Sequence, residues 1–307
     1  MEFRKDYILE RWALISEGRG KRPHELSIKE ELVFPKEDMF ASGNESMTPP
    51  EIRRTGGEKW TTRTIWNKFP ALSPSCPYKP KTDNKYFTWS PSCGYHWVLV
   101  ETPGQKQLAE LSEEEITNIL NEYKNIILDL ETKPDVAYVN VFKNHGAKAG
   151  TSIVHSHSQI IATPMIPPHV KEEILAARKF IKCPYCEIIE VEKNSERRIT
   201  ENEDFIAFCP YASTYNYEAI ILPKKHLRRM EELNLENLAK VMKKILTKLH
   251  AMNASYNYYI HYSPKSENYH FHIKITPRTA IWAGFELESA VIINSVPPEE
   301  AARYYRE

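Results

Sequence analysis

The sequence lacks a long apolar run and an excess of either charge. No stretch reaches the roughly eighteen apolar residues of a membrane-spanning helix, and the opening residues MEFRKDYILERW mix both charges without an apolar core. Lys plus Arg and Asp plus Glu both number 41, so no basic block stands out to attract a polyanion. We therefore expect a globular, cytoplasmic protein with no membrane and no nucleic acid partner.

Cysteine is also scarce, with five residues in 307, and only two of the five share a motif. Cys183 and Cys186 have a Cys-x-x-Cys spacing, which is typical of a metal site or a redox pair. No thioredoxin-like pattern precedes them, which favours a metal with two further ligands. Cys76, Cys93 and Cys209 are scattered, and we expect them to be free thiols.

Two segments of the chain repeat the same order of signals, beginning near Trp97 and near Glu218. Each has a short apolar run, a proline, a helix with apolar residues every three or four positions, and two strand-like runs ending in Thr-Pro. Ser112 and Glu115 form a capping box before the first helix, and Asn234 can cap the second. The chain therefore looks like a duplicated unit.

A strand, a long helix and a strand pair form an α+β unit in which the helix lies on a largely antiparallel sheet. Two such units predict a pseudo-symmetric pair, with a first unit over residues 1–172 and a second over 173–307. Residues 32–60 show no clear period, so loops and short strands are expected there. The strand pairs are predicted over residues 137–143 and 153–162, and over 257–262 and 269–276.

The run from His155 to Gln159, His-Ser-His-Ser-Gln, carries the strongest chemical signal. On a strand, alternation places His155, His157 and Gln159 on one face, where they cost desolvation unless a ligand or partner satisfies them. The preceding loop, 144–152, is rich in small residues whose backbone N–H groups suit phosphate oxygens. An imidazole near neutral pH is a nucleophile for phosphorus. The alternatives are a solvated strand face and a metal site.

These residues resemble the active-site segment of galactose-1-phosphate uridylyltransferases, a transferase branch of the histidine triad superfamily. The resemblance includes Asn144-x-Gly146, and Gln159 stands where hydrolases of the superfamily have a third histidine. It extends to an N-terminal signature that includes Arg19 and Arg22, and to further loops. These loops are Asn67-Lys-Phe69-Pro-Ala-Leu72 on the nucleotide side and Gly284-Phe285-Glu286 on the sugar side.

The resemblance implies two tandem histidine-triad-like units and a double displacement. His157 would take the nucleoside monophosphate from a nucleotide sugar and pass it to a hexose 1-phosphate, with His155 and Gln159 beside it. It also implies a homodimer in which the sugar-side loop, Gly284 to Glu286, comes from the partner. Contacts to the nucleotide and its phosphates are implied for Arg19, Arg22, Asn67, Asn144, Ser152 and Gln159.

The resemblance also implies a structural zinc site formed by Cys183, Cys186, His226 and His270, with His272 as an alternative ligand. Counting back from the two Thr-Pro pairs makes His270 the counterpart of His157. Many relatives hold a second zinc near the active site, with the first histidine of the catalytic run, here His155, among its ligands. Alignment on Gly43-Asn44-Glu45 places Asp38, Ala41 and Gln105 where the other three ligands stand, so we expect no metal there.

The expected activity is UDP-glucose–hexose-1-phosphate uridylyltransferase, which is galactose-1-phosphate uridylyltransferase. Ser156 and Ser158 resemble a branch of ADP-glucose phosphorylases, which use phosphate as the acceptor, and this remains the alternative. A non-catalytic nucleotide-sugar binding protein is an alternative of another class, and a metal-dependent hydrolase is a third. The base and the acceptor stay open at this point.

Overall fold

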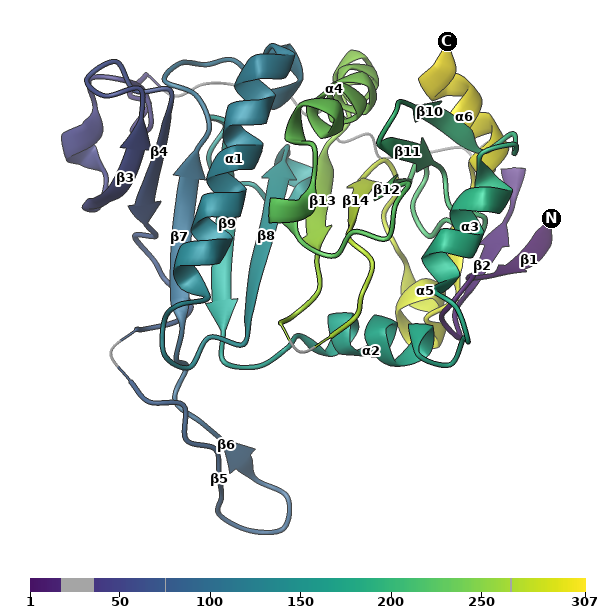
Figure 1. Ribbon diagram of the computed structural model, residues 1–307, viewed down its shortest axis with the longest axis horizontal. Coiled ribbons are helices and arrows are strands. Elements are labelled where there is room, and N and C mark those ends of the chain that lie inside the picture. The colour runs from purple at the N-terminus through teal and green to yellow at the C-terminus, as the bar shows by residue number, and fades with distance from the viewer. Residues whose placement is uncertain (18–35, 75, 266) are drawn as a thin grey trace.

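A single antiparallel sheet of ten strands runs through the computed structural model, which describes residues 1–17, 36–74, 76–265 and 267–307 (Figure 1). Within these residues, no helix combines the length and apolar character needed to cross a membrane. Across the sheet the strands are β10 (Arg198–Glu201), β11 (Phe205–Phe208), β12 (Ala219–Pro223), β14 (His272–Pro277), β13 (Tyr256–His261), β8 (Tyr138–His145), β9 (His157–Thr163), β7 (Tyr95–Val100), β4 (Thr62–Trp66) and β3 (Glu51–Thr55).

The strand order shows the duplication directly. From the centre outward the first half reads β8, β9, β7, β4, β3 and the second half reads β13, β14, β12, β11, β10. The halves meet where β8 pairs with β13, with Lys143 opposite Tyr258. The fold is therefore α+β, with two similar units sharing one sheet. The boundary expected at residue 172 would fall within α2 (Pro168–Ala177) and stays a prediction.

Helices α1 (Glu113–Leu130) and α4 (Leu235–Ala251) lie side by side over one face of the sheet (Figure 1). The first begins at the predicted capping box, where Ser112 Oγ accepts from the Glu115 N–H and Glu115 Oε2 accepts from the Ser112 N–H. The second begins after Asn234, whose side chain accepts from the Asn237 N–H. Their apolar faces and the inner face of the sheet form the main core.

Smaller elements complete the molecule. Helix α3 (Pro184–Glu192) starts at the Cys-x-x-Cys motif, and α6 (Pro298–Arg306) ends the chain. A three-stranded sheet of β1 (Glu2–Lys5), β2 (Trp12–Ile15) and β15 (Ile292–Asn294) lies beside α6, and α5 (Gly284–Ser289) precedes β15. In the described part of the chain the short 3-10 helices are Glu45–Met47, Leu108–Glu110, Ala147–Ala149 and Met230–Glu232.

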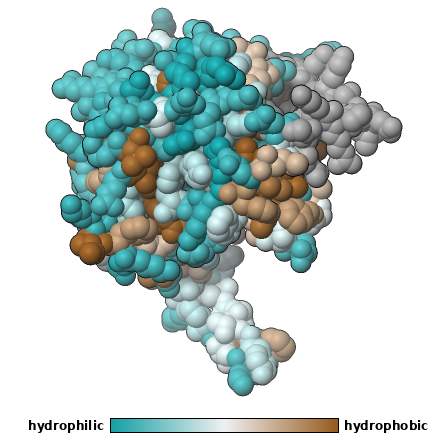
Figure 2. Space-filling view, turned by 90° about the vertical axis from the view of Figure 1, so that its right-hand side faces the viewer, coloured by the Kyte–Doolittle hydropathy of each residue, from teal (hydrophilic) through white to brown (hydrophobic). Residues whose placement is uncertain are grey.

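The hairpin of β5 (Lys81–Thr82) and β6 (Thr88–Trp89) forms an arm that projects away from the body in both views, which differ by a quarter turn (Figures 1 and 2). Figure 2 also shows that the end of the molecule facing the viewer is mostly hydrophilic, with separate apolar patches. A disulfide between Cys76 and Cys93 closes the base of the arm. The expectation of free thiols was wrong for these two residues, because the arm brings positions seventeen apart together.

Candidate active site and metal centre

His157 is the first residue of β9 and lies opposite Val100 of β7. Its Nδ1 is 2.7 Å from the carbonyl oxygen of His155. A carbonyl only accepts, so Nδ1 carries the hydrogen and the lone pair is on Nε2. Burial, and secondly the ammonium of Lys143, lower the pKa of His157 to about 4. At neutral pH the imidazole is therefore an uncharged base with Nε2 unprotonated.

The strand β9 starts at His157 and not at the predicted residue 153, so His155 lies just before it. The imidazole of His155 still lies near that of His157. The rings of His155 and His157 each form a T-shaped contact with the Phe40 ring, with centroids 6.0 Å and 5.5 Å away. His155 Nδ1 lies 2.7 Å from Asp38 Oδ2, and Nε2 lies 2.7 Å from the Thr102 carbonyl oxygen. The described structure thus fixes both nitrogens of this ring.

Gln159 contacts a histidine that the sequence analysis missed. His96 Nδ1 accepts from the Ala71 N–H at 3.1 Å, so Nε2 carries the hydrogen and donates to Gln159 Oε1 at 3.0 Å. Burial lowers the pKa of His96, which keeps the ring neutral. Asn67 Nδ2 lies 3.0 Å from the same Nε2, a contact of two donors that is not a hydrogen bond in this tautomer, and Asn67 Oδ1 accepts from the Phe69 N–H. The available signal was a single polar side chain at position 96 in an otherwise apolar run.

A buried ion pair lies behind the catalytic run, on the side of the sheet that faces α1. The carboxylate of Glu101 pairs with the ammonium of Lys143 and accepts hydrogen bonds from the hydroxyls of Ser156 and Ser158. Burial raises the pKa of Glu101, but Lys143 and the hydroxyls outweigh it and hold the pKa below its usual value. Lys143 also donates to the His157 carbonyl oxygen. The sequence offered only a weak signal for this pair. Lys143 is a charged residue within the apolar strand β8, and Glu101 is one directly after the apolar strand β7.

The loop before the catalytic strand is fixed at its start. Asn144 Oδ1 accepts from Asn257 Nδ2 at 2.8 Å, and these two residues are register partners across the centre of the sheet. Gly146 has φ +82°, and a Cβ there would lie 2.0 Å from Ser255 Oγ, so no other residue fits. Ser152, farther along the loop, is exposed.

The sugar-side residues Gly284, Phe285 and Glu286 begin α5, far along the sheet from His157. Glu286 lines a cavity of about 1010 Å³ on the face opposite α1 and α4, together with Phe142 of β8. None of the described contacts joins α5 to His157. Arg19 and Arg22 lie outside the described residues.

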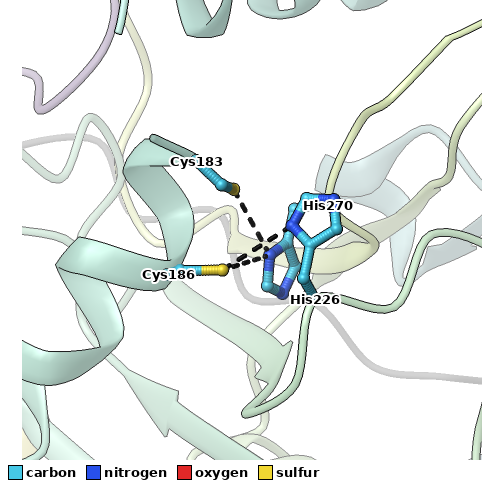
Figure 3. Close-up of side chains that lie close together, drawn as sticks. All are labelled: Cys183, Cys186, His226 and His270. Carbon is cyan, nitrogen blue, oxygen red and sulfur yellow. Dashed lines mark hydrogen bonds between the residues drawn. The ribbon is translucent and has the colours of Figure 1, made fainter. Parts of the chain in front are cut away.

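Cys183, Cys186, His226 and His270 converge on one point (Figure 3). Their ligand atoms all lie within 4.8 Å of one another. Cys186 Sγ is 3.6 Å from Nδ1 of both histidines, and Cys183 Sγ is 3.6 Å from His270 Nδ1. Zinc bond lengths to sulfur and nitrogen with tetrahedral angles give an S···N separation of about 3.5 Å, so the four residues fit such an ion.

The outer nitrogens of these two histidines are also held. His226 Nε2 donates to Asn268 Oδ1 at 2.8 Å, and His270 Nε2 donates to the Pro223 carbonyl oxygen at 3.0 Å. Such contacts fix the tautomer that directs Nδ1 towards a metal. The alternative ligand named from the sequence, His272, is not part of this group.

A second group in the same unit brings Glu173, His261 and His272 together in the interior. Here a cation is already present, because the ammonium of Lys274 contacts Glu173 Oε1, and the Tyr269 hydroxyl donates to Oε2. The Cys-containing group is therefore the better metal centre.

The structure corrects the predicted counterpart of His157. His272 begins β14 as His157 begins β9, and His272 Nδ1 faces the carbonyl of His270 as His157 Nδ1 faces that of His155. The counterpart of His157 is therefore His272, and that of His155 is His270. Counting back from Thr-Pro failed because β9 has more residues before its Thr-Pro than β14.

Comparisons with known proteins give the family. Residues 2–167 match galactose-1-phosphate uridyl transferase, N-terminal domain, and residues 103–304 match a domain of unknown function (DUF4921). An ADP-glucose phosphorylase of Arabidopsis thaliana is 32% identical over 100% of this chain and 92% of its own length. A galactose-1-phosphate uridylyltransferase of Thermotoga maritima is 28% identical over 100% of this chain and 98% of its own.

Solved structures of related proteins have a similar fold. A crystal structure of an Arabidopsis thaliana ADP-glucose phosphorylase with bound ADP-glucose matches with a TM-score of 0.85 and 32% identity, covering 100% of this chain and 98% of that one. A uridylyltransferase structure matches with a TM-score of 0.76 and 28% identity, covering 100% and 97%. Fold and relatives together define a nucleotidyltransferase. The chain belongs to the galactose-1-phosphate uridylyltransferase family.

Proposed function

We propose that the chain transfers a nucleoside monophosphate from a nucleotide sugar by way of a covalent bond to His157 Nε2. One observation carries the proposal. The His155 carbonyl holds the Nδ1 hydrogen of a buried, uncharged imidazole, which leaves the Nε2 lone pair available. Imidazole forms a P–N bond that keeps the nucleotidyl group activated for a second transfer.

In the first step the Nε2 lone pair attacks the α-phosphorus, and the bond from that phosphorus to the bridging oxygen breaks. The sugar 1-phosphate leaves with the electron pair. His157 keeps its Nδ1 hydrogen, so the imidazole carries a positive charge that the His155 carbonyl stabilises. In the second step an acceptor oxygen attacks phosphorus, the P–N bond breaks, and the pair returns to Nε2.

Gln159, Asn67, Asn144 and Ser152 are the described candidates for holding the nucleotide and its phosphates. His96 aims the Gln159 amide by engaging its oxygen, which leaves the Gln159 N–H groups to donate to a phosphoryl oxygen. Donors fixed in this way stabilise the charge that develops in the transition state. The roles of Arg19 and Arg22 remain proposals from the sequence.

The similarity to ADP-glucose phosphorylase favours adenylyl transfer from ADP-glucose to phosphate. That relative has the higher identity of the two reported and the higher structural similarity. The Ser156 and Ser158 pattern agrees with it. Uridylyl transfer from UDP-glucose to a hexose 1-phosphate, the activity first expected from the sequence, is the second candidate, supported by the Thermotoga maritima relative.

A homodimer is part of the proposal. Helix α5, with the sugar-side residues Gly284, Phe285 and Glu286, has no described contact to His157 of its own chain. A partner subunit would bring its α5 to the sugar side of the site. Phe285 is half exposed and available for this contact.

We assign the four-residue group of Cys183, Cys186, His226 and His270 to a structural zinc ion. Structural zinc sites with four protein ligands commonly use two thiolates and two imidazoles. Here the Nε2 atoms of both histidines also donate hydrogen bonds, which orients their Nδ1 atoms. When bound, the ion would tie the start of α3 to the strand region that carries His270. It takes no part in the transfer.

Intact mass tests the transfer. The protein is mixed separately with ADP-glucose, UDP-glucose and GDP-glucose without an acceptor. A covalent nucleoside monophosphate adduct is expected from ADP-glucose, and the donor that gives the adduct identifies the base. Added phosphate or hexose 1-phosphate should then discharge the adduct, which identifies the acceptor.

The control is His157→Asn, which keeps a hydrogen-bonding side chain but cannot form the P–N bond. An adduct that persists in this variant, or no adduct from any of the three donors, contradicts the mechanism. His145→Asn is the matched variant, because His145 is also buried but has no assigned step, and its adduct should form.

A further inference from the structure

His155 and His270 occupy equivalent places in the two units. Each precedes by two residues the histidine that begins the strand, and each donates from Nε2 to a carbonyl oxygen, that of Thr102 or that of Pro223. The Nδ1 atoms of His155 and His270 therefore face equivalent positions. At His270 that position is where four ligand atoms converge.

At His155 the same position holds a carboxylate. Asp38 Oδ2 is 2.7 Å from His155 Nδ1, whereas the Sγ atoms of Cys183 and Cys186 are each 3.6 Å from His270 Nδ1. The chain order also agrees, because Asp38 precedes β3 as Cys183 precedes β10.

The other two ligand positions of the first unit are not occupied by ligands either. Ala41 follows Asp38 by three residues, as Cys186 follows Cys183. Gln105 follows Thr102 by three residues, as His226 follows Pro223. With no thiol and only one imidazole, the four positions Asp38, Ala41, Gln105 and His155 do not match the zinc site of the second unit or that of its family.

The hydrogen count makes the replacement neutral overall. The Thr102 carbonyl only accepts, so His155 Nε2 carries a hydrogen, and His155 Nδ1 and the Asp38 carboxyl share a second one. The pair then sums to zero charge, as do Zn²⁺ and two thiolates. The exchange thus leaves the charge of the buried site unchanged.

We propose that the hydrogen-bonded pair of Asp38 and His155 replaces the metal of the first unit, and that Asp38 is a positioning residue for His157. The second clause rests on the proposed function. Asp38 Oδ2 holds the His155 ring, whose backbone carbonyl holds His157 Nδ1. Asp38 Oδ1 accepts from the N–H of Phe40, the residue whose ring meets both histidines. One carboxylate therefore fixes the nucleophile from two sides.

Elemental analysis tests the first clause without any substrate. Purified wild-type protein should contain one zinc ion per chain, Cys183→Ser should contain none, and Asp38→Asn should keep one. Two metal ions in the wild type, or loss of metal on Asp38→Asn, would overturn the replacement.

The rate of His157 adduct formation at saturating donor tests the second clause. Asp38→Asn should slow the reaction roughly tenfold, the effect typical of losing an outer partner of a functional histidine, with donor KM unchanged. Asp38→Glu, which keeps the carboxylate, should recover most of the rate, and Asp129→Asn on α1 is the matched control. An unchanged rate in Asp38→Asn, or an equal loss in Asp129→Asn, contradicts the positioning role.

A gain of metal is the strongest test. The triple variant with Asp38→Cys, Ala41→Cys and Gln105→His should bind a second zinc ion, and that zinc should restore part of the rate lost in Asp38→Cys alone. A triple variant that keeps a single zinc ion refutes the equivalence of the two sites. Should wild-type protein form no adduct, the proposed function fails while the zinc counts still decide the replacement.

Discussion

The Nζ atom of Lys143 lies 3.0 Å from the carbonyl oxygen of His157, and the same ammonium pairs with the carboxylate of Glu101. Both charges are buried away from water, so each is stabilised mainly by the opposite charge of the other. The pair also explains the two serines of the catalytic run, whose hydroxyls satisfy Glu101 on the helix side of the sheet. The strand that carries His157 is thus held, on the face of the sheet opposite the His157 side chain, by the ion pair of Lys143 and Glu101.

Lys143→Met should be the most destabilising single change in this region. It leaves the Glu101 carboxylate buried without its cation, and breaking a buried pair costs about 3–5 kcal/mol in the free energy of unfolding. The double variant Glu101→Gln with Lys143→Met should lose less, because neither charge remains. Urea unfolding measures both, and a double variant no more stable than Lys143→Met argues against this account.

The pKa of His157, lowered to about 4 from its usual value of 6.5, predicts an unusual pH profile. The imidazole stays neutral as the pH falls through 6.5, so the rate of adduct formation should stay level to about pH 5 and fall by half near pH 4. Rapid mixing with intact-mass detection measures this. A fall centred near pH 6.5 would show an ordinary, solvated histidine.

The lowered pKa of His157 also makes the free energy of unfolding depend on pH. Between about pH 4 and pH 6.5 the unfolded chain binds a proton at His157 that the folded chain does not, so stability decreases as the pH falls through this range. His157→Asn should remove this part of the pH dependence. The free energy of unfolding of this variant is measured against that of wild type over the same pH range. The wild-type reference is needed because burial also lowers the pKa of His145, to about 3, so His145 contributes its own pH dependence to both proteins.

Local signals in the sequence were sufficient to predict the two long helices. The capping box at Ser112 and the apolar periodicity of both long helices predicted α1 and α4, because helix starts depend on residues close in the chain. The Cys183 spacing and the family resemblance predicted the four residues that converge near the start of α3, and the zinc ion itself stays a proposal. The expectation that the first unit holds no metal stays a prediction, made because Asp38 stands where a thiol would be needed.

The missed features depend on contacts between distant segments. Glu101 and Lys143 lie on different strands, and only the pairing of the sheet brings their charges together. His96 was missed because its role depends on β7 lying beside β9. The counterpart of His157 was misassigned because a count along the chain does not reveal the hydrogen bonds that define equivalent positions.

His96→Phe should reduce catalysis more than stability. The substitution removes the donor that holds Gln159 Oε1, so the amide no longer has one fixed orientation. Since one fixed donor in a transition-state site contributes on the order of 10²-fold, we expect a loss of about 10-fold to 100-fold in single-turnover rate. Trp97→Phe is the control, because its indole N–H has no partner among the described residues. Equal losses in both variants would indicate a packing effect instead.

Mixing two inactive variants tests the shared site. His157→Asn lacks the nucleophile, and Phe285→Ala lacks the apolar side chain of α5 that the partner subunit would present to the sugar. In a mixed dimer one site combines the intact His157 of one chain with the intact α5 of the other, while the second site carries both defects. Random exchange makes half of the dimers mixed, so the mixture should regain about one quarter of wild-type activity per chain, although each variant alone is nearly inactive. Steady-state turnover after subunit exchange measures this, and activity that stays at the mean of the two separate variants shows that each chain completes its own site.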